Sequence, residues 1–201
     1  KPLIFTNNDS GYEAAIEFKK NGVDPIILDT RKEPNSEIID EAKKLDIQIK
    51  FSYVVVAAKG YKKVNAAEIA KISDNKKDIG VLENINCDCI CVSGFWTPTI
   101  HLASQSGNKT KFNKDIDAFV PGISKQNETT LGAANGTFTL EETLKDSLNV
   151  GYELSKKITK NDNKISCPKV VEKNKTIHDK FWCVPLPKGK TYKRFLDFQN
   201  D

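Results

Sequence analysis

Residues 3–11 read Leu3-Ile4-Phe5-Thr6-Asn7-Asn8-Asp9-Ser10-Gly11, and this stretch decides the fold. Its apolar first half predicts a short buried strand. Ser10 and Glu13 fit a capping box, and Asn21-Gly22 supplies a helix stop, so we expect a helix over about residues 11–21. The chain therefore opens with a strand, a short polar turn and a helix.

Two more strands follow at the spacing of βαβ units. Residues 23–29 form a second apolar run about 20 residues after the first. Asn35 or Ser36 can cap another helix, and Ile47-Gln48-Ile49 begins a third strand. The opening predicts a βαβαβ order, with right-handed crossovers and parallel strand pairing.

The pattern changes after the third strand. Residues 53–58 and 64–72 predict an antiparallel hairpin around a turn at 59–62, and 84–92 predicts one further strand. Downstream, we expect a strand near 116–120 and a helix that begins near Leu140. The fold class is α/β: a Rossmann-like parallel sheet with an appended antiparallel β-hairpin layer.

Composition narrows the class of protein. The 201 residues are 38% apolar and 29% charged, which excludes a disordered tail, and no apolar run is long enough to span a membrane. The chain has no methionine and opens Lys1-Pro2-Leu3, so we interpret it as a piece of a longer polypeptide. Five cysteines, three of them at Cys87, Cys89 and Cys91, favour a reducing compartment, so we expect a cytoplasmic protein.

Charge is distributed unevenly along the chain. Residues 156–194 hold 12 Lys/Arg against 3 Asp/Glu, whereas the rest of the chain is net acidic. This stretch contains prolines and lacks the interleaved aromatic residues of a nucleic-acid module, so we expect no nucleic-acid partner. We interpret it as a linker or as a strap over a neighbouring surface.

Two turns are candidates for nucleotide binding. The turn after the first strand has only the third glycine of G-x-G-x-x-G, at Gly11, and Asn8 and Asp9 stand where a pyrophosphate would lie. Gly132-Ala133-Ala134-Asn135-Gly136 is the better candidate, because small residues at a helix start let a phosphate approach backbone N–H groups. A tight helix-entry turn packed on a sheet explains the same residues.

Metal and catalytic sites have little support in the sequence. On an extended strand the three clustered cysteines would point to one face, where C-x-C-x-C is a poor zinc clamp, so we expect buried, inert thiols. His101 and His178 are the only histidines, and neither lies in a metal-ligand spacing. We expect no metal site and no catalytic residue.

Several segments together resemble one family, the alpha subunit of heterotetrameric sarcosine oxidase and related amine-oxidising flavoenzymes. The resemblance is carried, in this order, by residues 5–15, 92–102, 104–106, 118–122, 132–136 and 197–201. It implies a fold like that of FAD/NAD-linked disulfide reductases, in which one dinucleotide domain interrupts another. Residues 1–96 would be the inserted domain, 97–157 the returning part of the NAD-binding domain, and 158–201 a basic strap leading to a downstream domain.

The resemblance also implies cofactors and partners. NAD would lie on a domain whose glycine motif precedes Lys1, and the returning loop would cover part of it through Gly132, Ala133, Ala134, Gly136, Phe138 and Leu140. FAD and FMN would be associated with the complex, tetrahydrofolate with a downstream domain, and the partners would be beta, gamma and delta subunits.

The implied activity is oxidative demethylation of sarcosine to glycine, formaldehyde and hydrogen peroxide in the complete complex. The isolated chain would be catalytically silent and would bind no cofactor tightly. Two alternatives stay open: the alpha subunit of a related proline-, opine- or glycine-oxidising flavin dehydrogenase, and a non-catalytic module for subunit assembly.

Overall fold

The computed structural model describes residues 1–94, 96–159, 165–171 and 179–190. The chain divides into two compact units. The first combines residues 1–95 with 176–201, and the second comprises residues 96–175.

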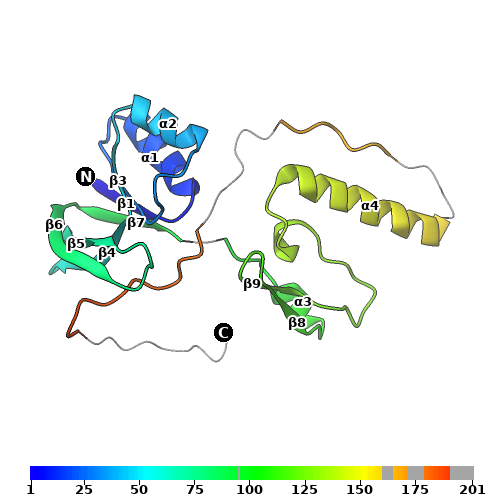
Figure 1. The fold of residues 1–201 in the computed structure, drawn as a ribbon. Helices are drawn as coiled ribbons and strands as arrows, with labels where there is room; N and C mark the ends of the chain where they lie inside the picture. Colours follow the sequence, from blue (N-terminus) through cyan, green and yellow to red (C-terminus); the bar gives the residue numbers. More distant parts are fainter. Residues whose placement is uncertain (95, 160–164, 172–178, 191–201) are drawn as a thin grey trace. The chain divides into compact units, whose positions relative to one another are not determined.

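A four-stranded parallel sheet with the strand order β3-β2-β1-β7 forms the centre of the first unit (Figure 1). The central strand β1 (Pro2–Thr6) pairs with β2 (Ile26–Asp29) on one side and with β7 (Cys89–Ser93) on the other. β3 (Gln48–Phe51) extends the sheet beyond β2. All three pairings are parallel, as the sequence predicts for its first three strands.

Two helices connect these strands and cover one face of the sheet. α1 (Ser10–Lys20) joins β1 to β2, and α2 (Glu37–Lys44) joins β2 to β3. Ile4 and Ile27 of the sheet pack against buried residues of both helices, Tyr12 among them. The predicted βαβαβ order is confirmed.

An antiparallel sheet with the order β4-β5-β6 covers the other face (Figure 1). Its strands are β4 (Tyr53–Gly60), β5 (Val64–Ile72) and β6 (Ile79–Asn86). Leu3 and Leu28 pack against its inner side, because successive side chains of a strand point to opposite faces. The expected fold class is confirmed, and the expected hairpin has a third strand.

The single strand expected over residues 84–92 is wrong. β6 ends at Asn86 and β7 begins at Cys89, in the other sheet. The backbone changes partner between them: the amide of Cys87 donates to the carbonyl of Asn65, whereas that of Asp88 donates to the carbonyl of Lys1. Residues 79–93 thus contribute one strand to each of two sheets, with only Cys87 and Asp88 between the strands.

The expectation of three buried thiols on one face is also wrong. Cys87 precedes β7 and is buried under the antiparallel sheet, whereas Cys91 packs on the helical face. Cys89 is exposed, with its Sγ 3.7 Å from that of Cys91. Burial is the largest cause that raises the pKa of the Cys87 thiol and that of Cys91.

The second unit holds a small sheet and a long helix. β8 (Thr110–Asn113) pairs antiparallel with β9 (Ala118–Pro121), and only β9 is expected from the sequence. A short helix, α3 (His101–Gln105), precedes them, and a 3-10 turn, η1 (Gly132–Asn135), leads toward α4 (Leu140–Thr159). The helix expected from Leu140 is confirmed. The assignment of residues 1–96, 97–157 and 158–201 to an inserted domain, a returning segment and a strap stays a prediction.

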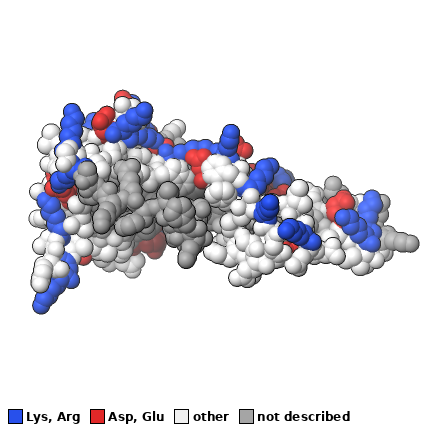
Figure 2. All heavy atoms as spheres, turned by 90° about the horizontal axis from the view of Figure 1, so that it is seen from below, with Lys and Arg blue, Asp and Glu red and all other residues white. Residues whose placement is uncertain are grey.

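Among the helices of the described residues, none has both the length and the apolar composition of a membrane span. On the face of the molecule seen in Figure 2, lysines and carboxylates are interspersed over the described residues.

Gly11 provides a test of the packing between β1 and α1. A Cβ at this position would lie 2.6 Å from the Cβ of Thr6, whose hydroxyl is itself bonded to the carbonyl of Asn8. We expect Gly11→Ala to lower the free energy of unfolding by about 1–3 kcal/mol, as overpacking does in other cores. Urea denaturation of the variant and the wild type measures the change.

Gly151→Ala is the matched control, because a Cβ added there, on α4, meets no atom within 4 Å. We expect it to raise the stability by about 0.5–1 kcal/mol through helix propensity alone. Equal effects of the two substitutions would contradict the packing argument.

Candidate functional site

The carboxyl ends of β1 and β7 mark the place where an open α/β sheet binds its ligand. The connection from β1 leads to β2 on one side, while β7 lies on the other, so the strand order reverses between β1 and β7. Ligands of such sheets bind in the crevice outside this switch point. Here the crevice is bordered by the turn after β1, residues 6–11, and by Ser93 and Gly94.

The side chain of Asn8 fills the switch point. Its Nδ2 donates to the carbonyl of Gly94 at 2.6 Å and to that of Ser93 at 3.3 Å. Its Oδ1 accepts from the amide and the hydroxyl of Ser10, at 2.9 and 2.6 Å. Asn8 is fully buried, and its side chain ties the end of β1 to the end of β7.

This arrangement does not fit a dinucleotide. A pyrophosphate at the switch point needs the backbone of the second glycine position to lie against it, and at Asn8 a bonded side chain takes that space. The predicted capping box is also wrong. The Ser10 hydroxyl bonds Asn8 and Ser93, and α1 has no side-chain cap.

A buried ion cluster lies at the end of β2, where a dinucleotide fold places the acidic residue that binds the ribose. The guanidinium of Arg31 donates to Asp29 Oδ2 at 2.9 Å and to Asp9 Oδ1 at 2.7 Å, and all three side chains are at most 5% exposed. The Tyr12 hydroxyl donates to Asp29 Oδ2 at 2.7 Å. Asp29, which would bind a ribose hydroxyl in a dinucleotide fold, is thus fully engaged by the protein.

The pKa shifts reflect this burial. Burial lowers the pKa of the Arg31 guanidinium, but hydrogen bonds and charges of Asp29 and Asp9 outweigh it, and the net shift is upward. Burial, followed by the Asp29 charge, raises the pKa of the Tyr12 phenol. Arg31 therefore stays charged and Tyr12 stays neutral in the folded state.

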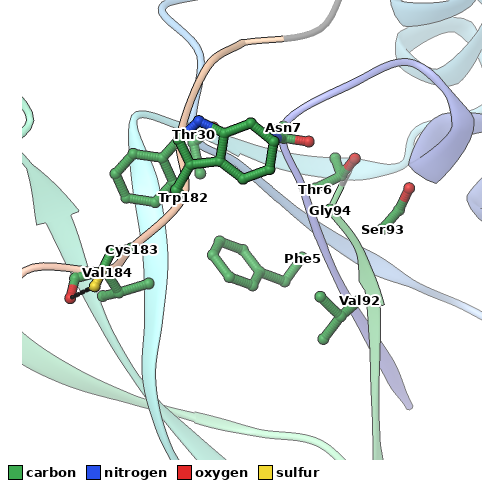
Figure 3. Close-up of a pocket in the computed structure, with 11 residues that line it drawn as sticks. Phe5, Thr6, Asn7, Thr30, Val92, Ser93, Gly94, Trp182, Cys183 and Val184 are labelled. Carbon is green, nitrogen blue, oxygen red and sulfur yellow. Dashed lines mark hydrogen bonds between the residues drawn. The ribbon is translucent and has the colours of Figure 1, made fainter. Parts of the chain in front are cut away.

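A segment near the end of the chain lies over the same edge of the sheet. Two hydrogen bonds join Asn7 and Asp179: the Asp179 amide donates to the Asn7 carbonyl, and the Asn7 side chain donates through Nδ2 to the Asp179 carbonyl, both at 2.9 Å. Lys76 forms an ion pair with the Asp179 carboxylate. Residues 181–184 then line a pocket at the ends of β1, β2 and β7 (Figure 3).

The other candidate, the loop before α4, is a contiguous turn within the second unit. Gly132 and Gly136 have φ values of +66° and +84°, which favour glycine. A Cβ on Gly136 would lie 2.6 Å from Ile116 Cδ1, so packing alone explains this glycine. Ala134 is half-buried, whereas Ala133, Phe138 and Leu140 are exposed.

The start of α4 is capped by the protein itself. Thr139 Oγ1 accepts from the amide of Glu142 at 3.3 Å and donates to the Glu142 carboxylate at 2.7 Å. The bond from the Glu142 amide is an N-cap, and the Glu142 carboxylate holds the Thr139 hydroxyl in place. A ligand that approaches this loop therefore meets the exposed backbone and side chain of Ala133 rather than an uncapped helix end.

The described part of the chain does not bring metal-ligating side chains together. Within the residues that the structure describes, no group of three or more His, Cys, Asp or Glu side chains could hold a metal ion. His101 begins α3 and is exposed, and His178 lies outside the described residues.

Comparison with known proteins identifies relatives along the whole chain. No family model matches. The sarcosine oxidase subunit alpha of Rhizobium meliloti (strain 1021) is 32% identical over 208 residues, which cover all of this chain and 19% of that protein. The sarcosine oxidase subunit alpha of Corynebacterium sp. (strain P-1) is 25% identical over 74% of this chain and 15% of that protein. The chain is homologous to sarcosine oxidase alpha subunits.

The chain spans about a fifth or less of the length of the curated relatives it matches. Among solved structures, two Cu(II) complexes of the HOCl-induced flavoprotein disulfide reductase RclA from Escherichia coli align with TM-scores of 0.55 and 0.53. They are 15% and 16% identical and cover 76% of this chain and 35% of theirs. Their likeness confirms the expected reductase-like fold.

Arg31 provides a test of the buried cluster that it forms with Asp9 and Asp29. Arg31→Met leaves the carboxylates of Asp9 and Asp29 buried without their counter-ion. We expect a loss of about 3–5 kcal/mol in the free energy of unfolding, the usual result of removing one partner from a buried ion pair. The control is Lys32→Met, since Lys32 pairs with Asp74 at the surface, where both side chains are at least 75% exposed. Urea denaturation should show little change for Lys32→Met, and a similarly small change for Arg31→Met would refute the cluster's role.

Tyr12 predicts a dependence of stability on alkaline pH. The folded state keeps the phenolic proton, which the unfolded chain releases above its pKa of about 10. The Tyr12 contribution is therefore fully present below pH 10 and is lost as pH rises above it. In denaturation series across this range, Tyr12→Phe should show a shallower fall in stability than the wild type, whereas Tyr61→Phe, at a residue 96% exposed, should match the wild type. If the stability of the wild type and that of Tyr12→Phe fell equally with rising pH, the alkaline dependence would not come from Tyr12.

Proposed function

We propose that the chain is a section of the alpha subunit of a sarcosine oxidase-type flavoenzyme, in which it supplies scaffold and one side of an NAD site. The observation that carries the proposal is the match of the whole chain to a protein named sarcosine oxidase subunit alpha. In the complete enzyme, sarcosine, water and oxygen would give glycine, formaldehyde and hydrogen peroxide. The chain itself would be catalytically silent.

The two units have different roles in this proposal. In the first unit, the Asn8 side chain fills the switch point. Arg31 pairs with the Asp29 carboxylate, which would bind a ribose in a dinucleotide domain. This unit is therefore scaffold. In the second unit, the loop from Gly132 to Leu140 covers part of an NAD held mainly by protein outside these residues. Gly132, Ala133, Ala134, Gly136, Phe138 and Leu140 form this side of the site.

Further cofactors and partners belong to the rest of the enzyme. FAD and FMN supply the redox chemistry, tetrahydrofolate is bound by a downstream domain, and beta, gamma and delta subunits complete the complex. Exposed apolar side chains on α4, at Leu140, Leu154 and Ile158, support burial of this helix against further protein. Five free cysteines suit a cytoplasmic location.

Ala133 offers the test of the NAD side of the proposal. Its exposed position on the loop means that Ala133→Asp places a carboxylate where the cofactor's phosphates approach. In the full-length alpha subunit we expect NAD affinity to fall at least about tenfold, the equivalent of about 1.4 kcal/mol. Isothermal titration with NAD measures the affinity.

Ala14→Asp is the matched control, since Ala14 is an exposed alanine of α1 in the other unit. It should leave NAD affinity unchanged. An unchanged affinity in Ala133→Asp would remove the loop from the NAD site. Micromolar NAD binding by the 201-residue chain alone would contradict the proposed division between scaffold and cofactor-holding protein.

A further inference from the structure

Two cysteines of β7 lie in contact on one face of the parallel sheet. Cys89 and Cys91 are two residues apart on this strand, so their side chains point to the same face. Their Sγ atoms are 3.7 Å apart, and a hydrogen bond joins them. Neither cysteine lines the pocket at the ends of β1, β2 and β7. The pair is therefore separate from the switch-point crevice.

The two sulfurs differ in their access to solvent. Cys89 is exposed, whereas Cys91 is half-buried and packs against the core cluster under the helices, which contains Ile4. Burial, followed by the hydrogen bond with Cys89, raises the pKa of the Cys91 thiol. Cys91 thus keeps its proton and donates it toward Cys89. A small molecule in solution meets the sulfur of Cys89 first.

The other cysteines that the structure describes lack this arrangement. Cys87 is 4% exposed and packs under the antiparallel sheet. Cys167 belongs to the second unit, and Cys183 is exposed. Among the described cysteines, a contact between two sulfurs occurs only between Cys89 and Cys91. These two thiols are therefore placed to react with each other.

We propose that Cys89 and Cys91 form a redox site, which a hydroperoxide converts reversibly into a disulfide within β7. Exposure lets the oxidant reach Cys89, and the adjacent Cys91 supplies the thiol that resolves the first oxidation product. Redox-sensing cysteines in general combine these two features, an accessible thiol and a resolving thiol beside it.

The oxidation takes two steps. The Cys89 thiolate attacks one oxygen of hydrogen peroxide, the O–O bond breaks, and the leaving hydroxide takes up the proton that the thiol lost, which leaves a sulfenic acid on Cys89. Cys91 Sγ then attacks Cys89 Sγ, the S–O bond breaks, and the leaving hydroxide takes the Cys91 proton as water. In sum, two thiols and one peroxide give one disulfide and two waters.

The geometry of the strand makes this disulfide easy to reduce. Two residues of an extended strand span about 6.6–6.8 Å, the upper end of the Cα separation of about 4.4–6.8 Å in disulfides. The Sγ atoms must also close from 3.7 Å to about 2.05 Å, so the strand must shorten locally. β7 ends the strand order of its sheet and pairs there with β1 alone, so few hydrogen bonds resist this movement. Strained, exposed disulfides are the labile ones.

Hydrogen peroxide is a product of the reaction proposed above, so the oxidant would arise in the same complex. This source of oxidant rests on the proposed function, whereas the reactivity of the two thiols does not. The test therefore adds peroxide directly to the chain. Its outcome does not depend on whether the complete enzyme oxidises sarcosine.

Mass spectrometry of the 201-residue chain tests the proposal. The folded chain is treated with a small excess of hydrogen peroxide, and free thiols are then labelled with N-ethylmaleimide in urea. Without peroxide, Cys89 and Cys91 should both carry the label. After peroxide, both should lose it, and the peptide that contains them should be lighter by the mass of two hydrogen atoms. Cys87 should stay labelled, and dithiothreitol should restore the label on the pair.

Three variants identify the role of each sulfur. In Cys91→Ser the resolving thiol is absent, so the sulfenic acid on Cys89 should persist and be trapped by dimedone. In Cys89→Ser the half-buried Cys91 should keep its label and form no dimedone adduct. Cys183→Ser is the matched control, since Cys183 is another exposed cysteine of the first unit, and it should behave as the wild type. Circular dichroism of each variant checks that it is folded.

Three results contradict the proposal. If both cysteines keep their label after peroxide, the pair is not a redox site. If Cys89 forms a disulfide with Cys183 or with a second chain, or is oxidised further while Cys91 stays labelled, then Cys91 is not the resolving thiol. If dimedone traps Cys91 in Cys89→Ser as readily as it traps Cys89 in Cys91→Ser, exposure does not decide which sulfur reacts first.

Discussion

The hydrogen bonds of the Asn8 side chain determine what this sheet edge can and cannot bind. They join the turn after β1 to the end of β7, the two strand ends that border the binding crevice in dinucleotide-binding sheets. The parallel sheet, its crossover helices and Gly11 against Thr6 all follow the architecture of a dinucleotide domain. The space for the pyrophosphate is nevertheless taken up by protein.

Two other sets of contacts at this sheet edge also stand where a dinucleotide would bind. Arg31 pairs with two buried carboxylates, and Asp29, which stands at the ribose position, is hydrogen-bonded by protein groups alone. The segment from Asp179 lies across the same edge and is fixed by Asn7 and Lys76. The first unit thus keeps the fold of a nucleotide domain and uses its binding edge for internal contacts, which supports the scaffold role that we propose for it.

Local patterns in the sequence predicted the parts of the structure that depend on neighbouring residues. Strand and helix spacing predicted the βαβαβ order, which the structure confirms. The division of residues 79–93 into two strands was missed, because no glycine or proline marks the change of sheet at Cys87 and Asp88. The Ser10 hydroxyl was assigned to a cap, whereas its partners include Ser93, which is 83 residues away. The segment over the sheet edge could not be placed, since its contacts with Asn7 lie 172 residues apart.

The central claim is that Asn8 excludes a pyrophosphate from the switch point. An experimental structure of the full-length alpha subunit with NAD bound tests it most directly. The account predicts that Asn8 Nδ2 still bonds the Gly94 carbonyl, and that the NAD phosphates lie away from residues 6–11. Density for a pyrophosphate against the backbone of Asn8, with that bond broken, would contradict it.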